Sequence, residues 1–292
     1  MKYILVFGIS GQDGYYVNQI GQEKGFTVIG VSRTSLPIAG DVSSFECVSQ
    51  LVKDYKPIYI FHLAANSTTH HNAVLENHET ISTGTLNILE AVKQYSPNSK
   101  VFITGSGVQF ENTGVAIDES TAFEASSAYA VARIQSVYAA RYYRTLGIKA
   151  YVGYLFHHES AMRKNHHVSQ KIVRAIQQLK MGKQVELELG DISVAKEWSY
   201  AGDIVHAMFT LLEQDIIFEV VIGSGELHTI EEWLNVCFKT IGLDWQDHTK
   251  VLKDYKAEYK TLLSNPMLIK KMGWTPQCNF EAIALKMINE EM

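Results

Sequence analysis

Short apolar runs alternate with longer amphipathic stretches over much of the chain. Hydrophobic side chains occupy consecutive positions in each run, so both faces of the expected strand need to be buried. A turn or a helical pattern follows each run, which is typical of strands that alternate with helices. The pattern therefore predicts an α/β protein with a parallel sheet covered by helices on both faces. The expected strands are residues 3–8, 27–32, 59–65, 100–106, 149–156 and 218–223.

The regular alternation weakens after about Leu155. Helical patterns reappear at residues 168–181, 203–213, 229–241 and 265–272. No repeat, low-complexity run or Pro-rich linker divides the chain. We therefore expect a doubly wound parallel sheet with a smaller mixed C-terminal lobe over the strand ends, and a cleft between them.

Composition narrows the class of protein. The chain has 292 residues, 46% of them hydrophobic, and no window approaches the ~18 apolar residues of a membrane span. Lys and Arg number 26 against 31 Asp and Glu, so a net charge of -5 gives no general attraction for nucleic acid or acidic membranes. Residues 1–8 lack a signal-peptide pattern, and three scattered cysteines suit neither disulfides nor a metal. We expect a cytoplasmic protein.

Three histidine pairs raise the question of a metal site. They stand at residues 70–71, 157–158 and 166–167, without an HxxxH or CxxC spacing. Adjacent residues on a strand point to opposite faces, so such pairs are poor chelators. We expect no metal.

A glycine-rich turn follows the first expected strand. Gly8, Gly11 and Gly14 stand in the segment VFGISGQDGYYV, before a helical pattern. Small residues let the backbone approach a pyrophosphate, whose charge the helix N-terminus then stabilises. The second expected strand ends in Arg33, which suits a 2′-phosphate better than a ribose hydroxyl, and Asp41 can face the adenine. We therefore prefer NADP to NAD; an ordinary βα turn and a solvated surface arginine are the alternatives.

Several longer motifs occur in a specific order. They are FGISGQDGYYV, SAYAVAR, YLFHHES, VSQKI, KEWSYAGDIVHAM and LLSNPMLIKKMGWTP. In order and spacing the chain resembles the extended short-chain dehydrogenase/reductases, and among them the GDP-mannose 4,6-dehydratase family. The resemblance implies a Rossmann-type NADP-binding domain at residues 1–155, with 197–223 returning to it. Residues 156–196 and 224–292 would form the substrate-binding lobe.

The resemblance also assigns residues to roles. The substrate would be a nucleotide-diphosphate sugar, held by Lys171, Lys196 and Tyr255; two ordinary surface lysines are the alternative for the first two. The family has an arginine where Lys196 stands, and another near Tyr255, so the preference for guanine does not transfer. The implied cofactor-binding residues are Gly8, Gly11, Gln12, Asp13, Gly14, Arg33, Asp41, Leu63, Ala64, Ala65, Tyr129, Arg133, His158 and Arg163.

Tyr129 and Arg133 lie one helical turn apart, so their side chains share a face. In the family, the tyrosine exchanges a proton with O4 while hydride moves between C4 and the nicotinamide, and a lysine holds the position of Arg133. A free phenol has a pKa of about 10 and needs a nearby cation. Arg133 supplies charge and donors but releases no proton. We therefore expect Arg133 to stabilise the Tyr129 phenolate electrostatically without relaying a proton. The alternative is that Tyr129 and Arg133 only flank the sheet.

The family's dehydratases carry a threonine and an acid/base glutamate after the strand that corresponds to residues 100–106. Counted without a gap from Tyr129, these positions are Gly105 and Gly107. A shift of one residue makes Ser106 the hydroxyl, and Ser106 is our third catalytic candidate. No carboxylate follows before Glu111. Losing the acid/base costs elimination about 10²–10⁴-fold, so ordinary dehydration is disfavoured.

Three functions remain open. The preferred one is reduction of a 4-keto sugar nucleotide by NADPH, with Tyr129, Arg133 and Ser106 at the centre. The second is 4,6-dehydration with a substitute base such as Glu111, Glu159 or a histidine. The third is a sugar-nucleotide-binding subunit with weak catalysis.

Assembly is predicted from two helical segments. Residues 84–92 and the helix that begins near Tyr129 carry surplus apolar residues, among them Val137, Tyr138 and Tyr142. By resemblance they form a four-helix interface in a homodimer or homotetramer. Burial under the C-terminal lobe is the alternative.

Overall fold

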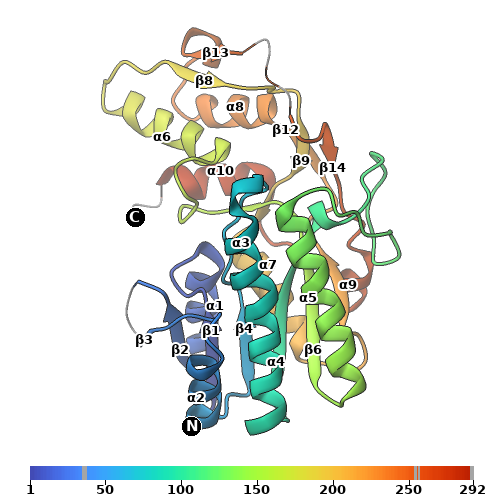
Figure 1. Cartoon of the computed structure of the whole chain (residues 1–292). Coiled ribbons are helices and arrows are strands. Elements are labelled where there is room, and N and C mark those ends of the chain that lie inside the picture. The colour runs from blue at the N-terminus through green and yellow to red at the C-terminus, as the bar shows by residue number, and fades with distance from the viewer. Residues whose placement is uncertain (35–37, 253–254, 256, 290–292) are drawn as a thin grey trace.

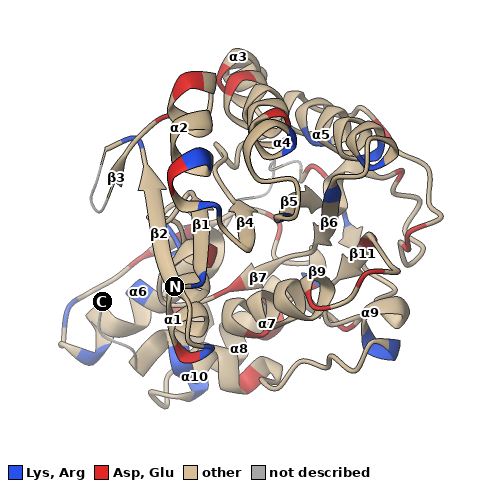
Figure 2. Cartoon of the chain, turned by 90° about the horizontal axis from the view of Figure 1, so that it is seen from below, with Lys and Arg blue, Asp and Glu red and all other residues tan. Residues whose placement is uncertain are grey.

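A computed structural model describes residues 1–34, 38–252, 255 and 257–289 of the chain. Its described residues form a parallel sheet of seven strands (Figure 1), in the order β11-β6-β5-β4-β1-β2-β3 that the labels of Figure 2 follow. Each predicted strand is present, so the predicted fold class is confirmed. The strands are β1 (Tyr3–Phe7), β2 (Thr27–Ser32), β3 (Ile38–Ala39), β4 (Tyr59–His62), β5 (Lys100–Ser106), β6 (Lys149–Leu155) and β11 (Glu219–Ile222).

The strand order reverses direction at β1. The chain runs outward from β1 to β2 and β3 on one side, and from β4 through β5 and β6 to β11 on the other. Loops leave the adjacent ends of β1 and β4 in opposite directions, which opens a crevice at the carboxyl edge of the sheet. The prediction of strand through residue 65 was wrong, because β4 ends at His62 and residues 63–65 line this crevice instead.

Helices cover both faces of the sheet, as Figure 2 shows. On one face lie α2 (Phe45–Tyr55), α4 (Gly84–Tyr95) and α5 (Ala128–Thr145), and on the other α1 (Gln12–Glu23) and α7 (Ala201–Leu212). Each face has its own buried apolar cluster. Because β11 joins the sheet and α7 packs on it, residues 197–223 supply elements to these layers. The exact domain limits at residues 155 and 223 stay a prediction.

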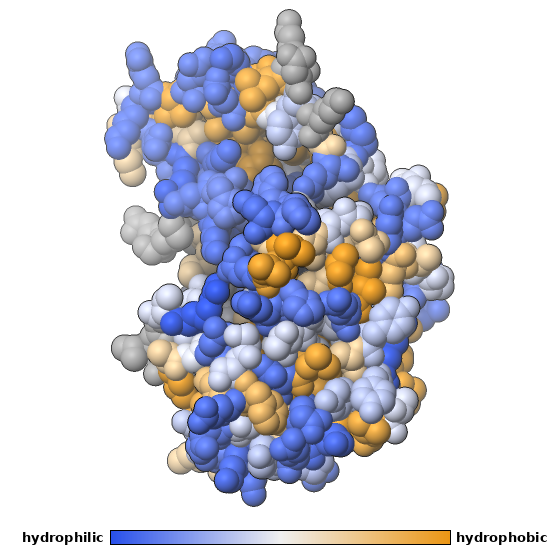
Figure 3. Space-filling view, in the orientation of Figure 1, coloured by the Kyte–Doolittle hydropathy of each residue, from blue (hydrophilic) through white to orange (hydrophobic). Residues whose placement is uncertain are grey.

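The outer surfaces of α4 and α5 carry exposed apolar side chains. Figure 3 shows hydrophobic patches among hydrophilic residues on the face that includes these helices. Tyr138 and Tyr142 are 58% and 60% exposed, and Leu86 is 48% exposed. Val137, however, is fully buried, so listing it as a surplus apolar residue was wrong: it packs into the cluster beneath α5.

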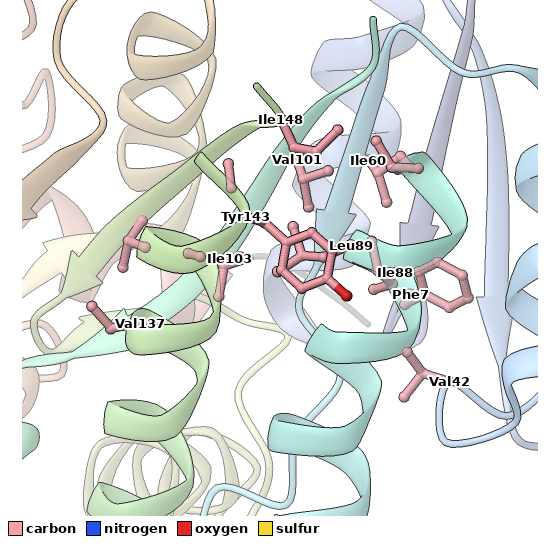
Figure 4. Packing of buried hydrophobic residues seen from close by; sticks show 14 of the residues in the cluster. Phe7, Val42, Ile60, Ile88, Leu89, Val101, Ile103, Val137, Tyr143 and Ile148 are labelled. Atoms are coloured by element: carbon pink, nitrogen blue, oxygen red, sulfur yellow. The ribbon is translucent and has the colours of Figure 1, made fainter. Parts of the chain in front are cut away.

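The inner surfaces of α4 and α5 pack on the sheet. Figure 4 shows Ile88 and Leu89 of α4 and Val137 and Tyr143 of α5 beside Ile60, Val101 and Ile103 of the strands. The Tyr143 hydroxyl reaches the edge of this cluster and donates to Glu90 at 2.7 Å. Apolar burial of this kind stabilises the sheet by about 25 cal/mol per Å² of buried surface.

The C-terminal lobe has a third apolar cluster, built by α6 (Val168–Lys180), α8 (Ile230–Lys239) and α10 (Phe280–Asn289). Trp198 and Trp233 stack at its centre with ring centroids 4.4 Å apart. The smaller sheets combine β12 (Leu227–Thr229), β9 (Ala195–Glu197) and β14 (Thr261–Leu262), and pair β8 (Leu187–Leu189) with β13 (Thr249–Val251). In Figure 1 this lobe lies above the carboxyl edge of the large sheet.

Short elements complete the described chain. Between β4 and α4 lie a 3-10 turn (His71–Ala73), α3 (Val74–Asn77) and a π-helical turn (His78–Thr83). Two more 3-10 turns lie at Gly107–Gln109 and Trp245–Asp247. The remaining elements are β7 (His158–Glu159), its parallel partner β10 (Ser199–Tyr200), and α9 (Met267–Lys271). None of the helices within the described ranges is both long and apolar enough to cross a membrane.

Candidate active site

The glycine turn brings β1 and the start of α1 against the loop after β4. Gly8 has φ +97, and a Cβ there would lie 2.7 Å from Ala64 N, so only glycine fits. A Cβ at Gly14 would lie 2.7 Å from Ile9 Cα. Gly11 caps α1 without a side-chain bond, which leaves backbone N–H groups at the helix N-terminus for an anion.

Two adjoining cavities extend from this turn. The first, about 180 Å³, is lined by seven of the predicted cofactor residues. The second, about 190 Å³, adds the rest of the glycine turn and Arg163. The two share the wall formed by Gly8, Gly11 and Leu63, so they make one groove along the carboxyl edge. The seven residues at the first cavity are Gly8, Gly11, Arg33, Asp41, Leu63, Ala64 and Ala65.

A third cavity of about 170 Å³ continues the groove and holds all three catalytic candidates. Tyr129 and Arg133 approach it from α5, and Ser106 from the end of β5. Asp13, His158 and Arg163 also line it. Residues from distant parts of the sequence thus meet where the nicotinamide end of a dinucleotide would lie, although their roles stay predictions.

Arg133 is almost fully buried, and its position is fixed. Ser127 caps α5 by accepting a hydrogen bond from Ala130 N at 3.1 Å, which sets where the helix begins. The Arg133 guanidinium lies over the Tyr129 ring, 4.9 Å from its centroid, and Nη1 donates to Thr104 O at 2.6 Å. Arg133 Nε has no hydrogen-bond partner. A buried cation with an unbonded donor is costly, so Arg133 is held in this position at a cost in folding stability.

Asp13 and His158 form a partly buried ion pair across the cavity. His158 Nε2 lies 2.9 Å from Asp13 Oδ1, and Nδ1 lies 2.8 Å from Phe156 O. Burial lowers the pKa of His158, but the facing carboxylate outweighs it and the net shift is upward. Burial raises the pKa of Asp13, but the His158 charge outweighs it and the net shift is downward. Asp13 is therefore engaged by the histidine and is not a free base.

Aromatic rings occupy the space beside both glycines that follow β5. A Cβ at Gly105 would lie 2.5 Å from the Tyr154 ring, and one at Gly107 would lie 2.8 Å from the Phe156 ring. Ser106 and Val108 line the third cavity with their neighbours. In the register shifted by one residue, Ser106 and Val108 take the positions of the threonine and the glutamate, and both already have side chains at this cavity, whereas a side chain at Gly105 or Gly107 would have to displace a ring. Neither register supplies a carboxylate.

An ionic cluster of buried and partly buried side chains forms part of the wall of the third cavity. His157 Nε2 lies 2.9 Å from Lys196 Nζ and contacts the Glu159 carboxylate, and Arg163 Nε lies 3.5 Å from Glu159 Oε2. Burial raises the pKa of Glu159, but the charge of Arg163 and the hydrogen bond with His157 outweigh it and hold the pKa well below its usual range. Burial, and then the charge of Lys196, lower the pKa of His157 to about 3. Burial also lowers the pKa of Lys196 to about 8.

A larger cavity in the C-terminal lobe, about 390 Å³, brings together the three predicted substrate residues Lys171, Lys196 and Tyr255. Lys171 is an exposed residue of α6, whereas Lys196 is buried on β9. The Tyr255 ring packs against Gly190, where a Cβ would lie 2.5 Å from it. The three residues converge from separate segments, and the substrate role remains a prediction.

The structure adds site residues that the sequence did not single out. Tyr259 lines both the third cavity and the cavity of Lys171, and Lys164 lines the first two cavities. His157 enters the third cavity beside His158.

The sequence predicted that adjacent histidines point to opposite faces. This is correct for residues 157 and 158, whose side chains contact Glu159 and Asp13 respectively. It is wrong for residues 166 and 167, which precede α6 and have ring centroids 4.3 Å apart. Among the described residues, no cluster of three or more His, Cys, Asp or Glu could hold a metal ion.

Comparison of the whole fold gives neighbours among solved structures. RMD from Pseudomonas aeruginosa, complexed with NADPH, superimposes with a TM-score of 0.85 at 20% identity, covering 99% of this chain and 98% of that one. The UDP-glucose 4-epimerase of Thermotoga maritima, with UDP-glucose, gives 0.86 at 20% identity, covering 98% and 97%. At these identities the likeness establishes the shared fold.

Sequence comparison is more specific. GDP-mannose 4,6 dehydratase 1 of Arabidopsis thaliana is 32% identical over an alignment that covers 100% of this chain and 90% of the relative. The GDP-mannose 4,6-dehydratase of Yersinia enterocolitica is 29% identical, covering 99% and 93%. The family model for GDP-mannose 4,6 dehydratase matches residues 5–287. The chain therefore belongs to the GDP-mannose 4,6-dehydratase family, a group of nucleotide-sugar enzymes.

Proposed function

We propose that this enzyme reduces the 4-keto group of a sugar nucleotide with NADPH. One observation carries the proposal: the cavity of Tyr129, Arg133 and Ser106 has the groups that carbonyl reduction needs, but lacks a free carboxylate. Among the described residues that line it, the one carboxylate is Asp13, which is bonded to His158. Elimination needs a base for the C5 proton, whereas reduction does not.

The residues have separate tasks in this proposal. NADPH, when bound, would supply the hydride for C4 and become NADP⁺. The Tyr129 hydroxyl gives a proton to O4. The C4=O double bond is thereby converted to a C4–H and a hydroxyl. Ser106 donates a hydrogen bond to the same oxygen, and Arg133 stabilises the phenolate through its charge. Solvent must then reprotonate Tyr129, because Arg133 does not release a proton.

The proposed cofactor is NADP(H). Arg33 lines the first cavity, at the end of β2, where a 2′-phosphate of adenosine would lie. A planar guanidinium suits phosphate because it donates two hydrogen bonds to it. Fold neighbours were solved with NADPH or with NAD, so the fold itself accommodates both cofactors.

The proposed substrate is a nucleotide-diphosphate sugar, with its diphosphate near Lys171 and Lys196 and its base toward Tyr255. These residues line the 390 Å³ cavity, which adjoins the third cavity through Lys196, His157 and Tyr259. We also propose a cytoplasmic location, which the three free thiols suit.

The decisive experiment incubates the protein with NADPH and 4-keto-6-deoxy forms of GDP-, UDP-, CDP- and dTDP-sugars. Loss of absorbance at the nicotinamide band, with a product two mass units heavier by mass spectrometry, is expected for one of them. In parallel, intact sugar nucleotides are supplied with NADP⁺. Loss of water from an intact sugar without net cofactor turnover would identify a dehydratase and refute reduction as the principal activity. Tight binding without either product would identify a binding subunit.

One observation favours dehydration as the second candidate. His157 lines the third cavity, so a ring nitrogen lies near the proposed reacting centre, although the pKa of about 3 that keeps this ring neutral also makes it a weak base. The other substitutes fit less well: Glu159 is fully buried between His157 and Arg163, and Glu111 is not among the residues lining this cavity.

A further inference from the structure

A segment of the C-terminal lobe crosses the cofactor groove between β7 and α6. It runs through residues 160–167, and Lys164 lies where the first two cavities meet. The segment is tied to the glycine turn, because Ser160 Oγ donates to Gln12 Oε1 at 2.9 Å and Gln12 Nε2 donates to His158 O at 3.4 Å. A turn in which His167 N donates to Lys164 O at 3.1 Å sets the course of the backbone. Lys164 is exposed.

Arg33 already has an anionic partner in the structure. Its Nη2 lies 3.1 Å from Glu76 Oε1, and the other oxygen, Glu76 Oε2, accepts a hydrogen bond from Asn66 Nδ2 at 2.7 Å. Hydrogen bonds from Asn66 and then Arg33 lower the pKa of Glu76, and the positive charge of Lys164 acts in the same direction. Glu76 is thus paired with Arg33 and lies within electrostatic range of Lys164.

The acidic groups at this end of the groove outnumber Arg33. Arg33 faces Glu76, and Asp41 also lines the first cavity. Without Lys164 the described groups would sum to one net negative charge, which opposes binding of a phosphate carrying about -1.5 to -2. Lys164 brings the net charge of these groups to zero. When Arg33 stays paired with Glu76, Lys164 is the cation that remains for the phosphate.

We propose that Lys164 and Arg33 together bind the 2′-phosphate of NADP, and that Glu76 competes with this phosphate for Arg33. The inference deepens the cofactor part of the proposed function and rests on it. In this proposal the 160–167 segment contributes to cofactor specificity, because Lys164 on that segment binds the 2′-phosphate that distinguishes NADP from NAD. Removing the competing carboxylate should therefore strengthen binding of 2′-phosphorylated ligands alone.

The test measures binding of four probes to the full chain by calorimetry at low ionic strength: NADPH, NADH, 2′,5′-ADP and 5′-ADP. Lys164→Gln should weaken NADPH and 2′,5′-ADP about tenfold, the effect of losing one charge-assisted bond, and change NADH and 5′-ADP less than about twofold. Glu76→Gln should tighten NADPH and 2′,5′-ADP by about threefold to tenfold without affecting the other two probes. Lys183→Gln, an exposed lysine outside the groove, is the matched control and should change none of them.

Two outcomes overturn the inference. An equal loss of NADPH and NADH binding in Lys164→Gln would mean that Lys164 binds the shared pyrophosphate. No loss for any probe would mean that Lys164 is only a solvated surface residue. The proposed reductase is judged separately, since these probes need no turnover: a protein that reduces no keto sugar can still show the Lys164 effect, and an active reductase can lack it.

Discussion

The guanidinium carbon of Arg133 lies 4.9 Å from the centroid of the Tyr129 ring, one helical turn away on α5. The same guanidinium donates to Thr104 O on β5, so it is fixed between the tyrosine and the end of the strand. Stacking on the ring face lets the cation stabilise negative charge on the phenol. A lysine at this position would carry a compact, mobile ammonium, which is a different electrostatic arrangement.

The first prediction concerns this cation. Arg133→Met removes the charge while keeping much of the side-chain volume, and kcat/KM for carbonyl reduction should fall about 10²–10³-fold. Arg133→Lys should recover part of the rate, because it restores the charge without the fork. Steady-state assays that follow NADPH absorbance measure both. Tyr129→Phe serves as the reference: it should bind NADPH as the wild type does and give no turnover. A wild-type rate in Arg133→Met would remove the guanidinium from the mechanism.

The second prediction concerns the glycine turn. Gly8 and Gly25 both have positive φ, +97 and +80, but a Cβ at Gly8 would meet Ala64 N at 2.7 Å whereas nothing lies within 4 Å at Gly25. Gly25→Ala should therefore cost only the conformational strain, about 1–2 kcal/mol of unfolding free energy. Gly8→Ala should cost more and should abolish dinucleotide binding, because β1 must move away from the loop after β4. Urea unfolding and NADPH titration check both. Equal stability losses in the two variants would contradict the close approach.

The third prediction uses the two registers after β5. Gly107→Glu would force a side chain into the Phe156 ring, so the unfolding free energy should fall by about 1–3 kcal/mol or more. Val108 is half-buried and lines the third cavity, so Val108→Glu should be tolerated better and should present its carboxylate there. Thermal unfolding distinguishes the two variants. If Gly107→Glu proves the more stable of the pair, the Phe156 ring does not restrict position 107.

Local pattern was enough to place the sheet and the glycine turn. Each of the six predicted strands is a run of consecutive apolar residues, which by itself indicates a strand buried on both faces. The positive φ at position 8 requires glycine, so the turn is also visible in the local sequence. The two-residue β3 and the helix α10 were missed, because β3 is too short to show a pattern and α10 gains its partners only from the packed lobe.

The site was only partly predictable for a related reason. Residues carried by motifs, such as Tyr129 and His158, were found and do meet in one cavity. Glu76, Lys164 and Tyr259 stand in no motif and acquire their positions from contacts between segments far apart in the sequence. The pairing of Asp13 with His158, 145 residues apart, likewise follows from the fold and not from spacing.

The fourth prediction concerns assembly. Tyr138 and Tyr142 of α5 are more than half exposed, as a face that binds a second copy of the chain requires. If α4 and α5 form the predicted four-helix interface, the wild type should run as a dimer or tetramer in light scattering, and Tyr142→Lys should reduce its mass with an unchanged circular dichroism spectrum. Ile216→Lys, at a position that is 87% exposed but lies outside both helices, is the control and should keep the wild-type mass. A monomeric wild type would refute the interface.

The fifth prediction is a pH dependence of stability that comes from His62. This residue ends β4 and is fully buried, with Nε2 3.3 Å from Ile81 O and no hydrogen-bond partner for Nδ1. Burial, and then the positive charge of Arg133, lower its pKa from 6.5 to about 4. The unfolded chain therefore binds a proton between these two pH values that the folded chain does not bind. The corresponding stability is fully present above pH 6.5 and is lost as the pH falls toward about 4.

The shift corresponds to a stability loss on the order of 3 kcal/mol across that interval. His62→Gln keeps a donor for Ile81 O and does not titrate, so its unfolding free energy should fall less steeply with decreasing pH. Because His157 and His167 also have lowered pKa values and remain in the variant, the readout is the difference between the two slopes in urea unfolding from pH 7 to pH 4.5. His206→Gln, at an exposed site on α7, should leave the slope unchanged. Parallel slopes for wild type and His62→Gln would show that His62 has the same pKa in the folded and the unfolded chain. That result would contradict the effect of its burial.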